Sequence, residues 1–151
     1  MKPIKAINQW SCALACIEAT LSKYHNPITQ SDIIKTYHPF FLAWRKNQEG
    51  LLTRAEIPYL LELLGYHFGL ILFTSDKDEF LAAFTKYHGL NRYWASFLIA
   101  HQPTNHCYAI VSLHGQGIAA MNPDQTTPTI DQMTFVDIHQ TRSPEYVLLC
   151  S

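Results

Sequence analysis

Residue types that together carry out nucleophilic catalysis are present in this chain, beginning with a cysteine near its start. Cys12 follows Ser11 and opens a segment whose apolar residues recur at helical spacing, so its thiol should lie in the first turn of a helix. We expect Ser11 to be the N-cap, its hydroxyl accepting from free amides of that turn. The positive end of the helix dipole favours a thiolate there over a thiol. Cys12 is therefore either a reactive nucleophile or a small buried apolar residue.

A base and an orienting group for that thiol are offered by the second half of the chain. His106 opens a strand pattern after a turn, and Asn122 ends the next strand, sixteen residues later. In a two-stranded hairpin centred on Gly115, the start of one strand and the end of the other lie side by side. We predict that the Asn122 amide oxygen accepts from one imidazole nitrogen and leaves the other to face the thiol.

Other side chains compete for these three roles. Cys16 lies one helical turn beyond Cys12 and should face the core, but it is the second candidate nucleophile. His101 is the rival base, although it lacks a partner at hairpin spacing, and Asp124 is the alternative orienting group. We interpret the remaining candidates as structural or solvated, namely Cys107 and Cys150 inside strands and His114 at the hairpin tip.

The elements that must position these residues divide the chain into a helical part and a strand-rich part. Capping and periodicity predict helices over 12–25, 30–37, 57–64 and 75–89. Apolar and β-branched runs predict strands over 68–73, 93–100, 106–113, 117–121 and 146–150. Residues 130–135 are ambiguous, and the aromatic segment 38–44 is either a core-filling connection or a loop over a cleft. Helices followed by an antiparallel sheet predict an α+β fold.

The bulk properties favour one domain over residues 1–151 and exclude several classes of partner. Hydrophobic residues make up 48 % of the chain and charged residues 15 %, as in a folded globule. A net charge of -1 and the lack of any Lys/Arg cluster give no footprint for nucleic acid. No Cys or His pair has zinc-site spacing, so we expect no metal and no cofactor.

The compartment is inferred from the N-terminus and the cysteines. Residues 1–7 alternate Lys with apolar residues and lack the apolar run of a signal peptide, and no stretch is long enough to span a membrane. We expect a soluble protein with no membrane association, either cytoplasmic or exported without a cleavable signal peptide. Its four cysteines should then be reduced.

A helix-opening cysteine in Ser-Cys-Ala-Leu-Ala-Cys, followed by a hairpin with His106 at its start and Asn122 at its end, resembles a papain-like cysteine peptidase. Within these it is most similar to the bacteriocin-processing (C39-type) group. The resemblance implies a helical N-terminal lobe, a β-sheet lobe after it and a cleft between them. It also implies Cys12 as nucleophile, His106 as general base and acid, and Asn122 as orienter. Gln9, with the Cys12 N–H, would be the oxyanion-hole donor.

The sequence departs from that family at three positions. Ala13 stands where the C39 group usually carries glycine, and Asn122 stands where it mostly uses aspartate. Gln9 lies only three residues before Cys12, closer than the family's glutamine, so Trp10 or a backbone amide is the substitute donor. No ATP-binding motif is present in the sequence, and we expect no coupling to export.

These residues predict a cysteine hydrolase that cleaves an amide bond in a peptide or protein substrate. The alternatives are an acyltransferase or transglutaminase-like enzyme with the same triad, and a non-catalytic peptide-binding module on the same scaffold. A metal-binding domain has the least support. Aromatic residues at Trp10, 38–44 and 93–94 suggest apolar or aromatic specificity, whereas the oligomeric state stays open.

Overall fold

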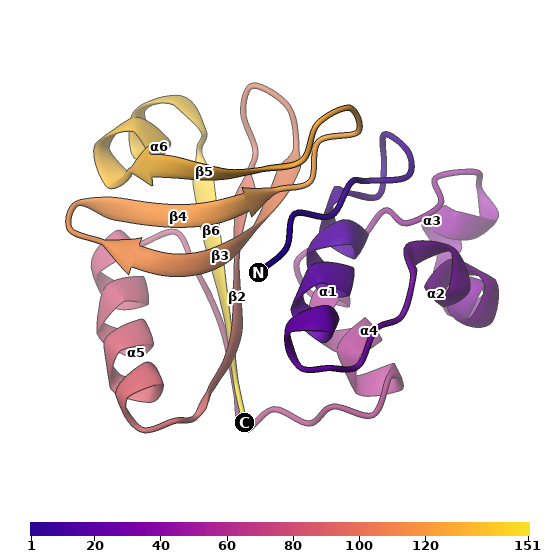
Figure 1. The fold of residues 1–151 in the computed structure, drawn as a ribbon, viewed down its shortest axis with the longest axis horizontal. Coiled ribbons are helices and arrows are strands. Elements are labelled where there is room, and N and C mark those ends of the chain that lie inside the picture. Colours follow the sequence, from indigo (N-terminus) through magenta and orange to yellow (C-terminus); the bar gives the residue numbers. More distant parts are fainter.

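The computed structural model describes residues 1–151, and a six-stranded antiparallel sheet runs through its centre (Figure 1). The strand order is β1-β6-β2-β3-β4-β5. The strands are β1 (Leu70–Thr74), β2 (Tyr93–Ala100), β3 (His106–His114), β4 (Gly117–Asn122), β5 (Thr129–Thr134) and β6 (Pro144–Cys150). The first and last strands of the chain are thus neighbours, and the α+β class predicted from the sequence is confirmed.

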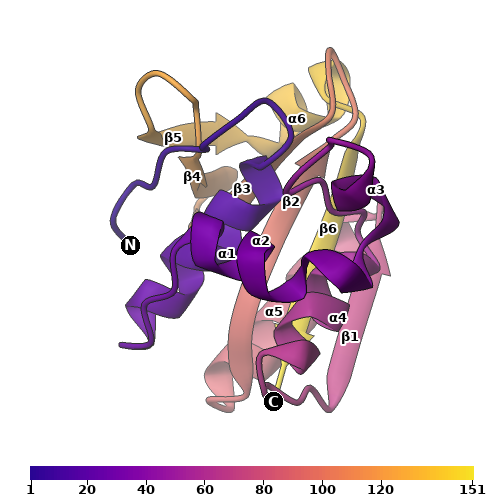
Figure 2. The same ribbon diagram turned by 90° about the vertical axis from the view of Figure 1, so that its right-hand side faces the viewer.

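Helices cover both faces of the sheet (Figures 1 and 2). On one side lie α1 (Cys12–Lys23), α2 (Gln30–Tyr37), the 3-10 helix η1 (His38–Phe40), α3 (Leu42–Arg45) and α4 (Glu56–Leu63). On the other side lie α5 (Lys77–Gly89) and α6 (Phe135–Thr141). None of these helices is both long and apolar enough to cross a membrane.

The interior strand β6, between β1 and β2, shows why both faces of the sheet need cover. Every residue of β6 is buried, because successive side chains point to opposite faces of a sheet. Val147 and Leu149 join the core under α1–α4, whereas Tyr146, Leu148 and Cys150 join the core under α5 and α6. The sheet therefore separates two hydrophobic cores.

The helix starts follow their capping residues. Thr29 accepts from the Asp32 amide at 3.2 Å, and Glu56 accepts from the Thr53 amide at 3.0 Å, as the sequence predicts. Asp76 caps α5, so this helix starts at Lys77, two residues later than predicted. Thr134 caps α6, a helix that the sequence reading did not predict.

Two ambiguous segments are resolved by the structure. Residues 130–135 belong mostly to β5, which pairs with β4 at the edge of the sheet. Within 38–44, Phe41 and Trp44 are buried and stacked with ring centroids 4.3 Å apart. These two residues fill the core, as the first interpretation predicts, whereas Phe40 and Leu42 of the same segment are exposed.

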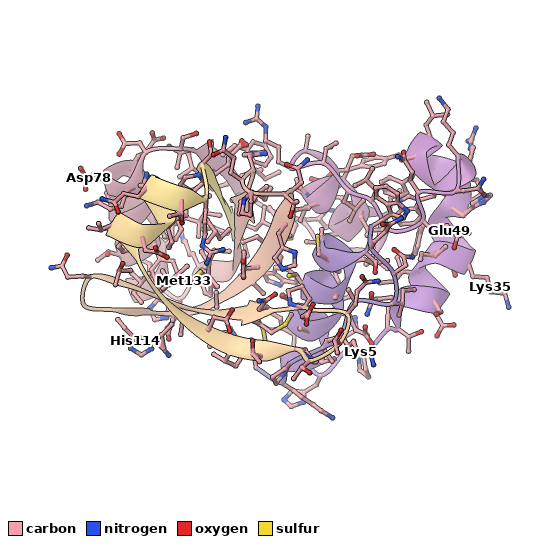
Figure 3. The ribbon with its side chains drawn as sticks, turned by 90° about the horizontal axis from the view of Figure 1, so that it is seen from above. Lys5, Lys35, Glu49, Asp78, His114 and Met133 are labelled. Atoms are coloured by element: carbon pink, nitrogen blue, oxygen red, sulfur yellow. The ribbon has the colours of Figure 1, made fainter.

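The hairpin of β3 and β4 turns at Gly115, which adopts a positive φ of 48°. His114 pairs with Gly117, and a bulge between Ile110 and Ser112 shifts the register before Ala109 pairs with Met121. His114 thus lies at the end of the hairpin remote from α1, exposed as predicted, whereas Lys5 of the N-terminal segment lies near the opposite end (Figure 3). That opposite end carries the start of β3 and the end of β4.

Candidate active site

Cys12 is the first residue of α1, and a tight turn before the helix holds it there. Ser11 occupies the N-cap position, but its side chain does not cap the helix, so that prediction is wrong. Its Oγ instead accepts from the Asn8 amide at 3.1 Å and donates to the Asn8 carbonyl at 3.2 Å. Asn8 Oδ1 also accepts from the Trp10 amide at 2.8 Å. The hydroxyl of Ser11 therefore stabilises the turn and leaves the first-turn amides without a side-chain partner.

The surroundings of Cys12 oppose ionisation of its thiol. Burial raises the pKa of Cys12 to about 11, and the nearby Cys107 adds to the rise. Backbone N–H groups of Cys107, Ala13 and Cys12 itself act in the opposite direction but do not outweigh burial. The expectation that the helix start alone favours a thiolate is therefore wrong, because desolvation is the larger effect. A base must take the proton if this thiol is to react near neutral pH.

His106 and Asn122 are brought together as the hairpin spacing predicts. His106 Nε2 lies 2.7 Å from Asn122 Oδ1. An amide oxygen only accepts, so Nε2 carries the proton of the neutral ring and Nδ1 has the free lone pair. This arrangement leaves Nδ1 as the nitrogen able to accept a proton.

Tyr108, two residues beyond His106 in β3, packs against the His106 ring from the same face of the strand. The two rings meet edge to face with centroids 4.7 Å apart. Tyr108 is buried, and Arg142 Nη1 donates to its hydroxyl at 2.9 Å. The alternation of β3 places Tyr108 beside His106, a signal that the sequence carried and the prediction did not use.

A cavity of about 930 Å³ contains Cys12 and His106 in its wall. Gln9 and Trp10 also line it, and the exposed Gln9 side chain makes no hydrogen bond within the chain. The aromatic segment 38–44 and residues 93–94 do not line the cavity, so of the residues on which the predicted apolar or aromatic specificity depends only Trp10 lines it. The remaining wall combines apolar and polar side chains, including Leu51, Leu52, Arg54, Ile57, Ile99, His101, Asp124 and Glu145.

His101 lies in the same cavity and has partners that its sequence position did not reveal. Its Nδ1 lies 3.2 Å from Asn105 Oδ1 and its Nε2 lies 3.4 Å from Glu145 Oε1. Glu145 is buried and also forms an ion pair with Arg54. Each ring nitrogen of His101 thus faces an oxygen, and a neutral ring donates to one of the two, whereas only one ring nitrogen of His106 faces a polar side chain.

The alternative orienting group, Asp124, and the second candidate nucleophile, Cys16, are placed less favourably for these roles. Asp124 accepts from the Thr127 amide at 3.3 Å, which closes a turn, and it makes no hydrogen bond to His106. Cys16 is fully buried in the core, as predicted, with its Sγ donating to the Cys107 carbonyl at 3.4 Å. Cys150 is likewise buried, and Cys107 lies in β3 at the cavity wall.

For metal binding, the structure gathers no group of three or more His, Cys, Asp or Glu side chains that could hold an ion.

Comparison with known proteins identifies the fold. No family model matches the sequence, and no curated protein matches it either. The structure is similar to the crystal structure of the peptidase domain of Streptococcus ComA, a bi-functional ABC transporter involved in a quorum sensing pathway. The TM-score is 0.66 at 12 % identity, and the match covers 99 % of this chain and 97 % of that chain. The resemblance to the C39 group predicted from the sequence is thus confirmed, and the fold is α+β and papain-like.

Proposed function

We propose that this protein is a cysteine peptidase-like hydrolase that cleaves an amide bond in a peptide or protein. Cys12 is the nucleophile, His106 the general base and acid, and Asn122 the orienting group. The observation that supports this most is the 2.7 Å hydrogen bond from His106 Nε2 to Asn122 Oδ1, beside a cavity that Cys12 also lines. The likeness of fold to a peptidase domain favours the same reaction class.

In the proposed cycle, Nδ1 of His106 removes the proton from the Cys12 thiol as Sγ attacks the scissile carbonyl carbon. A carbon–sulfur bond forms, and the carbonyl electron pair moves onto oxygen. The imidazolium then delivers its proton to the leaving amine as the carbon–nitrogen bond breaks. Water attacks the resulting thioester with His106 again as base, and the carboxylic acid leaves as the thiol is restored.

The oxyanion formed in this cycle needs hydrogen-bond donors. The Cys12 backbone N–H lies in the first turn of α1, where amides lack intrahelical partners. Gln9 is the proposed second donor, since its amide lines the cavity and is not engaged elsewhere in the chain. Asn8 does not suit this role, because its Nδ2 donates to the Glu49 carbonyl at 3.1 Å.

We further propose that residues 1–151 form one papain-like domain with two lobes. One lobe consists of α1–α4 and the other of the sheet with α5 and α6. The substrate cleft is the cavity between them, because its wall includes residues of α1, α4, β2 and β3. A peptide segment is the ligand that this site would hold.

The experiment compares the Cys12→Ala variant with the wild type and with Cys16→Ala, which removes a buried thiol one turn away. The probe is p-nitrophenyl acetate, an activated ester whose acyl group any competent nucleophile accepts. We expect the wild type and Cys16→Ala to release a burst of p-nitrophenol equal to the protein concentration, and Cys12→Ala to release none. Mass spectrometry should locate the acetyl group on Cys12.

A burst retained in Cys12→Ala would overturn the proposal. A folded wild type with neither a burst nor steady hydrolysis of the ester would also overturn it, and would favour the peptide-binding module without catalysis. Addition of a primary amine distinguishes the two enzymatic alternatives. A hydrolase passes the acetyl group to water, whereas capture of that group mainly by the amine indicates an acyltransferase.

A further inference from the structure

Asn122 has a second partner, on the side away from His106. Its Nδ2 donates to Asp131 Oδ2 at 3.0 Å, and Thr129 Oγ1 donates to Asp131 Oδ1 at 2.5 Å. Asn122 pairs with Thr129 across β4 and β5, and Asp131 lies opposite Ala120. These residues form one continuous chain of hydrogen bonds that ends at the ring of His106.

The carboxylate decides which end of the Asn122 amide faces His106. A carboxylate has no proton to donate, so it can only take the NH2 end of the amide. The oxygen end must then point at His106, and that oxygen can only accept. The ring is therefore held with its proton on Nε2 and its lone pair on Nδ1.

Without the carboxylate, the Asn122 amide could adopt either of two orientations, related by a 180° rotation, with similar contacts to its neighbours. Rotation by 180° would present NH2 to Nε2, which would then have to be the unprotonated nitrogen. The proton would move to Nδ1, and the ring could not accept a proton from a thiol on that side. An asparagine as orienter therefore needs a neighbour that fixes its rotation, whereas an aspartate would not.

We propose that Asp131 is a positioning residue of the site, which sets the rotation of the Asn122 amide and through it the tautomer of His106. This inference rests on the proposed function, because only a catalytic His106 requires a particular tautomer. The negative charge of Asp131 also faces the Nε2 side of the imidazolium that forms when the thiol loses its proton.

The test exchanges the two polar groups. Asp131→Asn alone leaves two amides that can rotate together, and Asn122→Asp alone brings two carboxylates face to face. The double variant Asn122→Asp with Asp131→Asn restores one carboxylate and one amide, with the carboxylate now on His106. Asp137→Asn is the control, because it removes a charge from an exposed position on α6.

Two readouts are used at pH 7, namely the 15N NMR shifts of His106 and the rate of Cys12 alkylation by iodoacetamide. We expect the Nε2–H tautomer in the wild type, the control and the double variant, and a mixture of tautomers in Asp131→Asn. The alkylation rate should fall about tenfold in each single variant and recover to within about threefold in the double variant. A merely structural role for Asp131 would not be rescued by exchanging it with Asn122.

A wild-type tautomer and rate in Asp131→Asn would overturn the inference, as would a double variant no better than Asn122→Asp. The NMR readout does not need a reactive thiol. A His106 tautomer that follows residue 131 in a protein whose Cys12 is inert would therefore overturn the proposed function and support the positioning role.

Discussion

At the scale of single residues, the raised pKa of Cys12 means that its reactivity depends on the histidine that accepts its proton. Burial raises that pKa to about 11, so an isolated thiol in this position stays protonated across the physiological range. A thiolate at neutral pH then has to exist as a pair with an imidazolium. Two histidines line the cavity, and only His106 has a ring nitrogen without a partner.

The pH dependence of alkylation identifies which histidine is the base. We expect the wild type to react with iodoacetamide at Cys12 below pH 8. His106→Ala should lose this reaction and gain reactivity only as the pH rises toward about 11, where burial places the thiol pKa. The rate constant at Cys12, followed by mass spectrometry from pH 5 to 11, measures the shift.

His101→Ala is the matched control, because it removes the second imidazole of the same cavity. Its profile should follow the wild type. The opposite result, a shift in His101→Ala and none in His106→Ala, would make His101 the base and Glu145 its orienting group.

The residues that the sequence alone could assign are those joined by local rules. Helix position places Cys12, and hairpin pairing brings His106 to Asn122, because both relationships follow from short spacings. Glu145 reaches His101 from forty-four residues away, so no local pattern predicts that contact. The contact of Asp131 with Asn122 was also not predicted, because the sequence of residues 130–135 does not identify them clearly as a strand.

At the scale of elements, the start of α1 depends on a loop that passes against it. Gly50 has φ of 89°, and a Cβ built there would lie 2.8 Å from the Cβ of Ser11. Real Cβ atoms do not approach so closely, so a side chain at 50 must displace the turn before Cys12. The position of the thiol is thus coupled to the loop between α3 and α4.

Gly50→Ala tests this coupling, with Gly65→Ala as its matched control. Both glycines need a positive φ, 89° and 100°, but a Cβ at Gly65 meets nothing within 4 Å. We expect each variant to lose about 1–3 kcal/mol in the free energy of unfolding by urea, because both strain the backbone. Only Gly50→Ala should also lower the rate of Cys12 alkylation. Equal rates in the two variants would contradict the coupling.

At the scale of the whole molecule, the sequence predicted the α+β class correctly but did not predict that helices cover both faces of the sheet. Capping residues and strand patterns place most elements, because those signals are local. The double cover of the sheet is harder to foresee, since a strand buried on both faces reads as one apolar run, as β6 does. Helix α6 was missed because its seven residues are too few for a clear period.

Tyr93 packs against the core under α5 and α6, and its ionisation should lower the stability of the protein at alkaline pH. This residue begins β2, its hydroxyl lies 3.2 Å from Ser96 Oγ, and burial raises its pKa from 10.0 to about 12. The unfolded chain therefore loses the tyrosine proton first as the pH rises. Stability is fully present below pH 10 and falls between pH 10 and 12, by an amount on the order of 2 kcal/mol from this residue.

Tyr93→Phe removes the ionising group and keeps the ring, so its unfolding free energy should decline less steeply above pH 10. Tyr59→Phe, at a ring that is exposed on α4, serves as the control and should decline like the wild type. Urea titrations at several pH values between 8 and 11.5, with reductant present, give the slopes. Parallel curves for Tyr93→Phe and wild type would mean that the core beside β2 admits the tyrosinate without cost, and that water reaches this face of the sheet.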